Sequence, residues 1–458
     1  MERKNIEFRL GIRSGLLPSD RKEHWINWIK MQRKVAIEGG RFTVKAILPE
    51  VIIWSNISTI PSIYSTTHEK GKTMPILTQE EFTRRHQAAL AATEASGLDA
   101  ILVFSTESEP AGVRYFADYW PSFETAAVLF PAKGEPALLI GPESLTFARS
   151  RSRISTIHQL MDFRESSQPD YPGSCLPTWA DIVSTYRLKK IGICGWQMFP
   201  YSILVPLAKA LGGLDKIVPA DDIIRPLYRR KSPAEIACLK AAAHASECGF
   251  KAVLEAIQPG MTEAELCGIA TAAMAAAGAE ANGYPIWCCS GPNSNQAISR
   301  PSLRKVGRGE IIHFSIGAKV EGYSASIGRP IVLGTCPEDL RRFLQVGLDA
   351  ANMTFDEMRA GVCAGDVARK IADFITRQGY GDAILYGPAH GCGQMECEYP
   401  FLETNSEYIL EPGMTFMQDM FLHRGEQGFR WEDGLLVRTE GPAEMLSSYG
   451  RQLNILDR

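Results

Sequence analysis

The chain has 458 residues, which is enough for two or three domains with a large core. Its residues are 45% hydrophobic and 22% charged, and its formal net charge is −3. This balance gives no electrostatic reason to expect nucleic acid or an anionic membrane as a partner. The apolar runs are much shorter than the roughly 18 residues that a membrane-spanning helix needs. We therefore expect no nucleic-acid partner and no membrane partner.

The eleven cysteines are scattered along the chain without a C-x-x-C pair. An odd count without paired spacing argues against a disulfide framework and against a structural zinc site. The amino-terminal stretch also lacks the apolar core and cleavage site of a secretory signal. These features favour the cytoplasm, where thiols stay reduced.

Residues 1–73 differ from the rest, because they are basic and then rich in Ile, Ser and Thr without a clear period. We interpret them as a poorly specified extension. The stretch from Met74 reads like the start of an independent domain, so a natural start at Met74 is a hypothesis for this chain.

Residues 74–228 alternate between helical and strand patterns, which is typical of an α/β domain. Thr78 and Glu81 have the spacing of a capping box, and Gly97 is expected to end the helix that follows. Residues 99–105 read as a buried strand. Residues 125–141 read as a hairpin over a Lys-Gly turn.

Residues 229–458 predict an α+β domain with two helices followed by curved antiparallel strands. Ser232, with Pro233 and Glu235 after it, predicts the start of the first helix. The strand-rich part contains the hairpin "IIHFSIGAKVEGYSASIGRPIVLG", residues 311–334. Because strand residues alternate sides, His313 and Ser315 share a face, as do Ser324 and Ser326. Short polar side chains on a buried face are costly, so a function is expected for them.

The order of motifs in residues 78–458 resembles the pita-bread family, which includes methionine aminopeptidases, prolidases, creatinase and ectoine hydrolase. The resemblance implies a creatinase-type amino-terminal domain followed by a pita-bread catalytic domain. The motifs that carry it are "RRKSPAEIACLKAAAHAS", "SGPNSN", "IGAKVEGYSASIGRPIVLG", "GPAHGCG", "LEPGMTF" and "WEDGLLV".

The metallopeptidases of this family use two Asp, one His and two Glu to hold two divalent ions. Matched motif by motif, these ligands fall on Ser315, Ser326, His390, Asp419 and Glu432. A second His of the peptidases falls on Cys397, although Glu398 beside it is retained. Because two anionic ligands have become hydroxyls, the resemblance implies no dinuclear centre, and we expect no metal and no cofactor.

Creatinase and ectoine hydrolase also lack the metal set, and both act on C–N bonds of small, charged, amino-acid-like molecules. The catalytic His of creatinase falls on Ile298, and its substrate-binding Glu falls on Gly328, so its chemistry is not inherited directly. The nucleophilic carboxylate of ectoine hydrolase falls on Ser315. The resemblance extends to agropine synthesis cyclase, which closes a lactone in an opine.

Ser315 is the candidate nucleophile, and a serine needs a base to take its proton. His390 is the first candidate base, and Asp419 or Glu432 would orient its imidazole. His313 is the second candidate, although side chains two apart on a strand need a bulge or a water to meet. The backbone amides of "HGCG" would help to hold an oxyanion.

A second set of residues is expected to bind substrate. Arg114 and Trp120 belong to it, because they lie in the stretch by which creatinase-type amino-terminal domains reach over the pocket of a neighbouring subunit. Arg329 has an alternative role in pairing with an internal acid. The set is Ser326, His313, Arg329, Glu398, Arg114 and Trp120.

The sequence thus predicts a cytoplasmic, homodimeric, metal-independent enzyme of the creatinase type. It would hydrolyse or cyclise an amide, lactam or lactone bond in a small amino-acid-derived compound, with opine lactonisation as one candidate. One alternative is a binding protein on an inactive peptidase scaffold, which predicts an apolar, closed pocket. Another alternative is a peptidase or lyase with a single metal ion.

Overall fold

The structure is a computed structural model that describes residues 35–38, 41–44 and 74–458. The chain divides into two compact units, residues 1–65 and 66–458. In the first unit, strands β1 (Val35–Glu38) and β2 (Arg41–Val44) form an antiparallel pair. The other residues of the expected extension, and so most of that interpretation, lie outside the described residues. Among the helices described, none is both long and apolar enough to cross a membrane.

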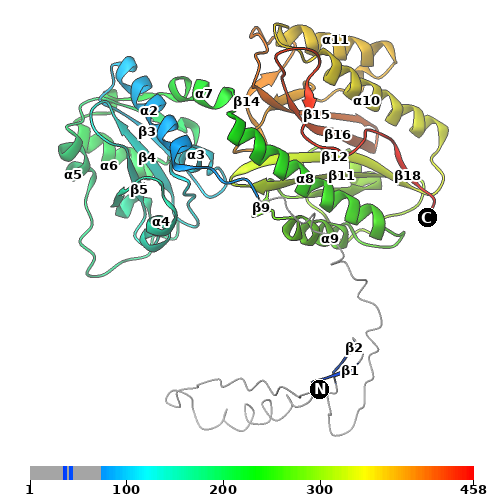
Figure 1. Ribbon diagram of the computed structural model, residues 1–458, viewed down its shortest axis with the longest axis horizontal. Coiled ribbons are helices and arrows are strands. Elements are labelled where there is room, and N and C mark those ends of the chain that lie inside the picture. Colours follow the sequence, from blue (N-terminus) through cyan, green and yellow to red (C-terminus); the bar gives the residue numbers. More distant parts are fainter. Residues whose placement is uncertain (1–34, 39–40, 45–73) are drawn as a thin grey trace. The chain divides into compact units, whose positions relative to one another are not determined.

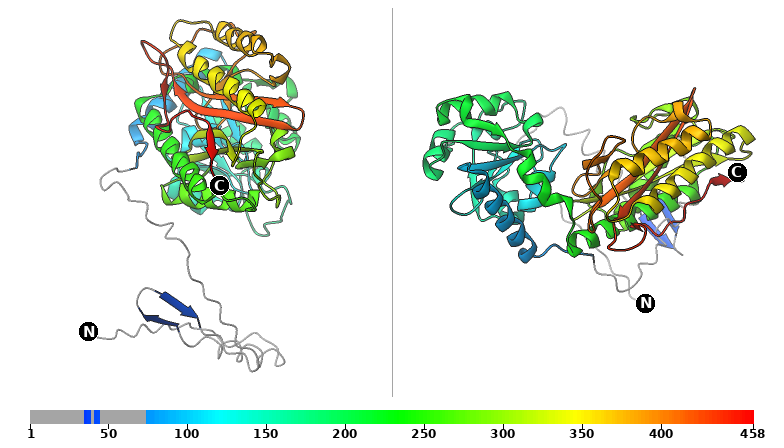
Figure 2. Two further views of the ribbon diagram at one scale, coloured as in Figure 1. Left: turned by 90° about the vertical axis from the view of Figure 1, so that its right-hand side faces the viewer. Right: turned by 90° about the horizontal axis from the view of Figure 1, so that it is seen from above.

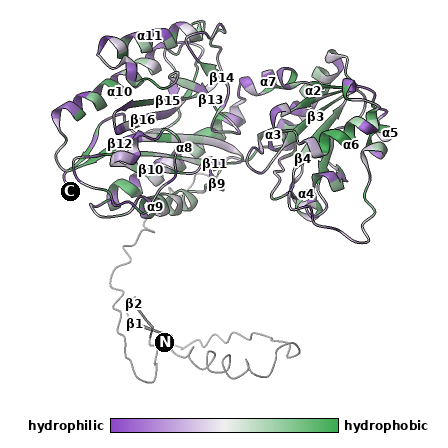
Figure 3. Cartoon of the chain, turned by 180° about the vertical axis from the view of Figure 1, so that it is seen from behind, coloured by the Kyte–Doolittle hydropathy of each residue, from purple (hydrophilic) through white to green (hydrophobic). Residues whose placement is uncertain are grey.

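The second unit begins with a six-stranded mixed sheet in the order β6-β5-β4-β3-β7-β8. The expected hairpin is confirmed as the antiparallel pair β4 and β5, and the strand predicted at residues 99–105 is β3. Figure 3 shows β3 and β4 as strongly hydrophobic, because both of their faces are covered by helices. The strands are β3 (Ala100–Ser105), β4 (Ala126–Pro131), β5 (Ala137–Ile140), β6 (Thr156–Gln159), β7 (Ile191–Cys194) and β8 (Ile217–Pro219).

One face of this sheet packs against α2 (Gln79–Ser96), α3 (Ala111–Ala117), α4 (Leu145–Arg151) and α7 (Asp221–Arg229). The other face packs against α5 (Trp179–Tyr186) and α6 (Tyr201–Leu211).

The predicted start and end of α2 had different outcomes. Gly97 ends the helix in the left-handed conformation, as expected. The capping box is wrong, because the Thr78 side chain makes no capping hydrogen bond. The Glu81 carboxylate instead accepts hydrogen bonds from Arg84 and Arg85.

Helix α8 (Pro233–Ala256) opens the second domain, with α9 (Glu263–Ala276) after it. The predicted start is confirmed, since Ser232 and Glu235 form a complete capping box with Pro233 at the first helical position. The domain is completed by α10 (Glu338–Glu357) and α11 (Ala364–Arg377).

The second domain is built on a ten-stranded sheet with the main order β10-β11-β12-β16-β15-β13-β14. Its strands are antiparallel apart from the parallel pair β12 and β18. The strands are β9 (Ala281–Asn282), β10 (Trp287–Ser290), β11 (Ile311–Val320), β12 (Tyr323–Leu333), β13 (Ala389–Gly391), β14 (Glu398–Leu402), β15 (Thr415–Arg424), β16 (Gln427–Leu436), β17 (Glu444–Met445) and β18 (Asn454–Leu456).

The two faces of this sheet have opposite character. One face carries large apolar side chains such as Phe314 and Trp431, which pack under the four helices α8 to α11 (Figures 1 and 2). The other face, here called the polar face, carries the predicted hairpin residues His313, Ser315 and Ser326. Because every residue of β11 and β12 except Lys319 is buried, the polar groups of this face are held away from bulk water.

Candidate active site

A row of four directly paired residues crosses the polar face. Ser315 on β11 lies opposite Gly328 on β12, Gly328 lies opposite Glu432 on β16, and Glu432 lies opposite Asp419 on β15. Directly opposed residues in a sheet point to the same side. Three of the predicted catalytic residues are therefore brought together, although they are up to 117 positions apart in the chain (432 minus 315).

Ser315 contacts His313, the second candidate base. The Ser315 Oγ lies 3.4 Å from His313 Nε2, and both residues are completely buried. The expectation that a bulge or a water is needed is wrong, because the register of β11 and β12 is regular here and the imidazole itself spans the gap. Burial and the nearby Arg430 lower the pKa of His313 to about 3. The imidazole is therefore neutral, and in the tautomer that carries its proton on Nδ1 its Nε2 accepts a hydrogen bond from the Ser315 hydroxyl.

Asp419 is held on the polar face by an ion pair with Arg430 and by a hydrogen bond from Tyr386. Arg430 Nε lies 3.0 Å from its Oδ1, and the Tyr386 hydroxyl lies 3.1 Å from both carboxylate oxygens. Arg430 in turn stacks over the Trp287 ring at 4.1 Å and donates to the Tyr386 oxygen at 2.7 Å. Burial raises the pKa of Asp419, but Arg430 and His390 outweigh it and leave that pKa lowered. Asp419 is therefore a carboxylate.

His390 lies between two acids. Its Nε2 is 3.6 Å from Asp419 Oδ2 and 3.6 Å from Glu396 Oε1, and its Nδ1 donates to the Gly391 carbonyl at 3.0 Å. Burial lowers the pKa of His390, yet Glu396 and Asp419 together raise it well above its usual value. The imidazole is thus a cation. This geometry contradicts the expected role as base to Ser315, because a protonated imidazole accepts no proton and, in the described chain, no hydrogen bond joins it to Ser315.

Glu432 is the protonated acid of the site. It is fully buried, it accepts a hydrogen bond from the Tyr284 hydroxyl at 3.0 Å, and its Oε1 has no partner among the described residues. Burial, together with the charges of Glu396 and Asp419, raises the pKa of Glu432 well above its usual value. The group that was expected to orient a base is therefore a proton donor.

Four residues of the site escaped the sequence analysis. Arg430 has a detectable signal, because it stands two positions before Glu432 and so shares its face of β16. Glu396 lies in an irregular segment, where no period predicts the direction of its side chain. Tyr284 and Tyr386 resemble ordinary core aromatics, and only the three-dimensional structure brings their hydroxyls to the acids.

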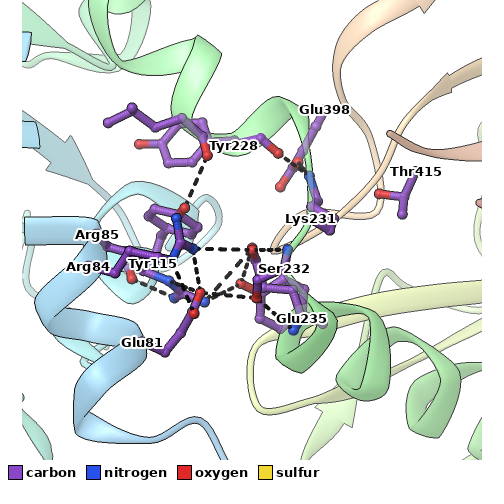
Figure 4. Close-up of polar contacts among 12 residues, drawn as sticks. Glu81, Arg84, Arg85, Tyr115, Tyr228, Lys231, Ser232, Glu235, Glu398 and Thr415 are labelled. Carbon is purple, nitrogen blue, oxygen red and sulfur yellow. Dashed lines mark hydrogen bonds and ion pairs between the residues drawn. The ribbon is translucent and has the colours of Figure 1, made fainter. Parts of the chain in front are cut away.

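Two predicted substrate-binding residues are engaged elsewhere. Arg329 points to the helix-covered side of the sheet, where it pairs with Asp433 at 2.8 Å with both side chains completely buried. The prediction that Arg329 contacts the substrate is therefore wrong. The structure shows its alternative role, which is an internal ion pair with an acid. Glu398 accepts a hydrogen bond from the buried ammonium of Lys231 at 3.1 Å. Both residues belong to the network of polar contacts near the start of α8 that Figure 4 shows.

Arg114 and Trp120 line a cavity of about 520 Å³, together with Tyr284 of the site. Arg114 Nη2 lies 3.0 Å from Glu280, and its guanidinium stacks over the Trp120 ring at 3.7 Å. Because the Tyr284 hydroxyl reaches Glu432, this cavity adjoins the acid of the site.

Ser326 lies on the polar face opposite Gly317, and its Oγ has no partner among the described side chains.

The backbone amides of "HGCG" are largely in use already. Cys392 N donates to Thr415 O, and Gly393 N donates to Met395 O. The prediction that these amides form an oxyanion hole is therefore wrong for Cys392 and Gly393, because both N–H groups already donate to carbonyl oxygens. Burial raises the pKa of the Cys392 thiol to about 12, so this cysteine is no nucleophile at neutral pH.

The donors on the polar face do not suit two divalent ions. Ser315 and Ser326 stand where bridging carboxylates would be needed, and their hydroxyls supply no charge. Arg430 already forms an ion pair with Asp419. Within the described part of the chain, no three His, Cys, Asp or Glu side chains are arranged to hold a metal ion.

Comparisons with known proteins agree with this architecture. Residues 85–227 match the Creatinase/Prolidase N-terminal domain, and residues 237–439 match Metallopeptidase family M24. The crystal structure of the prolidase from Pyrococcus horikoshii OT3 superimposes with a TM-score of 0.70 at 21% identity, over 81% of this chain and 99% of that one. The fold is thus a creatinase-type amino-terminal domain followed by an M24 pita-bread domain, as the sequence predicts.

Two curated relatives extend the match to sequence. The probable dipeptidase PepE of Mycobacterium bovis is 26% identical over 365 residues, which is 79% of this chain and 93% of the relative. The uncharacterized peptidase YqhT of Bacillus subtilis is 26% identical over 273 residues, which is 59% of this chain and 77% of the relative. Over residues 85–227 and 237–439 the chain is thus similar to Creatinase/Prolidase N-terminal domains and to Metallopeptidase family M24.

Proposed function

We propose that this chain is a metal-independent acyl-transfer enzyme on the M24 fold. It would cleave an amide, lactam or lactone bond in a small amino-acid-derived compound. The observation that carries the proposal is the contact of 3.4 Å between Ser315 Oγ and the neutral His313, beside a protonated Glu432. The relatives named as peptidases and dipeptidases support the cleavage of a peptide-like bond.

In this proposal, Ser315 Oγ attacks the acyl carbon while its proton passes to His313 Nε2. Glu432 gives its proton to the leaving nitrogen or oxygen, and the bond between that atom and the acyl carbon breaks. The cations His390 and Arg430 provide positive charge near the developing oxyanion. Water then attacks the acyl carbon and gives a proton to Glu432, while His313 returns its proton to Ser315 Oγ as the ester bond breaks. In ring closure, such as opine lactonisation, an internal hydroxyl of the substrate takes the place of that water.

The alternative of an inactive binding scaffold predicts an apolar, closed pocket. The polar face instead gathers Asp419, Glu396, Glu432, Arg430 and His390, and an unpartnered carboxyl oxygen on Glu432 supports a role in proton transfer. The alternative of a single-metal enzyme is less well supported, because Arg430 occupies the carboxylate that such an ion would need.

The test is a screen of small lactams, lactones, dipeptides and opines by mass spectrometry, with wild type and Ser315→Ala side by side. We expect turnover of at least one compound by wild type only, and a trapped acyl adduct on the peptide that contains Ser315. Equal turnover by Ser315→Ala would contradict the proposal.

We also propose a cytoplasmic homodimer. Phe123, next to the cavity residue Ser122, exposes 77% of its surface and would be covered by the second subunit. Sedimentation equilibrium of wild type and Phe123→Ser checks the oligomeric state, and a monomeric wild type would contradict it.

A further inference from the structure

The cavity of about 520 Å³ next to the site contains a cation and an amide that the proposed mechanism does not use. Lys319 and Gln394 both line it, and they come from β11 and from the segment after β13. Tyr284 lines the same cavity and its hydroxyl donates to Glu432, so this one side chain links the cavity to the acid of the site.

Lys319 has no ion-pair partner and no side-chain hydrogen bond among the described residues. It lies on the polar face four residues from Ser315, so the two Cα atoms are roughly 13 Å apart along the strand. Burial and the neighbouring Arg114 lower the pKa of Lys319. Arg114 and the nearby Glu280 form an ion pair with each other. The carboxylate of Glu280 is therefore already neutralised and does not pair with the ammonium of Lys319.

The buried side-chain amide of Gln394 provides the second, independent observation. Its side chain is 4% exposed, and neither its amide nitrogen nor its amide oxygen has a hydrogen-bond partner in the described chain. Buried amides without partners are rare in folded proteins, and a ligand is one way to satisfy them. Gln394 can donate one hydrogen bond and accept another.

From this juxtaposition we infer that the cavity is a carboxylate subsite, in which Lys319 binds a substrate carboxylate and Gln394 binds a polar group next to it. The inference rests on the proposed function and narrows its substrate class. The substrate is an acidic, amino-acid-derived conjugate, and its free carboxylate lies beyond the reacting bond by about the length of one residue. A dipeptide-sized or opine-sized molecule has this length.

The test is made in Ser315→Ala, so that binding is measured without turnover. The probes are N-acetyl-L-glutamine and its neutral carboxamide, N-acetyl-L-glutaminamide, which differ in a single carboxylate. We expect the acid to bind at least about tenfold more tightly than the amide by titration calorimetry or ligand-observed NMR. Adding Lys319→Met should abolish this preference, Lys319→Arg should retain most of it, and Gln394→Leu should weaken binding of both probes.

Lys133→Met is the matched control, because Lys133 is an exposed lysine on the turn between β4 and β5. It should leave both affinities unchanged. Equal binding of acid and amide, a preference that persists in Lys319→Met, or the absence of saturable binding by either probe would overturn the inference. If Ser315→Ala keeps its turnover while the acid preference depends on Lys319, the proposed nucleophile fails and the carboxylate subsite stands.

Discussion

Ser315 and Gly328 face each other across the β11–β12 hairpin, and a Cβ atom placed on Gly328 would lie only 2.5 Å from Ser315 Oγ. The same Cβ would lie 2.7 Å from Glu432 Cβ. Real Cβ atoms do not approach so closely, so only the absence of a side chain at position 328 lets Ser315 and Glu432 come this close to β12.

Gly328→Ala should therefore displace Ser315 or Glu432 and lower kcat by about 100-fold or more, since shifts near 1 Å have such effects in active sites. Circular dichroism should show an unchanged fold. Gly268→Ala is the control, because this glycine of α9 has no atom within 4 Å of its would-be Cβ. It should keep full activity and add about 0.5–1 kcal/mol of stability. Full activity in Gly328→Ala would contradict the importance of this close approach.

Ser315→Ala and His313→Gln should each reduce kcat by about a thousandfold or more, because each removes one half of the same proton transfer. The double variant should be no worse than either single variant, since groups that act as a unit are not additive. Ser324→Ala is a suitable control, as this buried serine shares the polar face but has no hydrogen-bond partner in the described structure. Additive losses in the double variant would show that the two residues act separately.

The buried, neutral His313 should make the protein less stable in mild acid. Its folded-state pKa of about 3 lies below the usual 6.5, so below pH 6.5 the unfolded chain binds a proton that the folded chain does not. Wild type should lose about 2 kcal/mol between pH 6.5 and pH 5 relative to His313→Gln. Denaturant titrations of both proteins at the two pH values measure this difference. Parallel pH profiles would show that His313 is not neutral in the folded state.

The fold could be predicted from the sequence to a large extent, because caps and periodicities are local signals. Ser232, Thr78 and Gly97 all mark helix ends correctly. The capping box at Thr78 does not form, because the Glu81 carboxylate binds Arg84 and Arg85. Because strand residues alternate sides, Arg329 must lie on the opposite face of β12 from Ser326. The position of Arg329 away from the polar face could therefore be predicted from the sequence.

The chemistry of the candidate site was less predictable. The row from Ser315 to Asp419 follows from the family motifs, but the charge of His390 depends on Glu396, which approaches it only in the folded chain. Sequence patterns do not encode such approaches between an irregular segment and a strand. The positive charge of His390 could therefore not be predicted from the sequence.

Arg329→Met should act on stability rather than on substrate binding. It would leave Asp433 as a buried carboxylate that retains Arg451 as its only ion-pair partner in the described chain, beside a hydrogen bond from Ser447, and breaking one side of a buried ion pair costs about 3–5 kcal/mol. KM of the folded fraction should be unchanged. Arg300→Met is the control, because Arg300 is exposed and contacts only a neighbouring carbonyl. A raised KM with unchanged thermal stability would contradict this prediction and indicate that Arg329 binds substrate.

The central claim is that this M24 fold catalyses acyl transfer with Ser315, His313 and Glu432 in place of two metal ions. The direct measurement is elemental analysis of the purified protein by plasma mass spectrometry, combined with turnover assays before and after dialysis against a strong chelator. We predict no stoichiometric divalent metal and the same turnover after chelation. Metal bound in stoichiometric amounts, with activity that is lost on chelation and restored by the ion, would contradict the account.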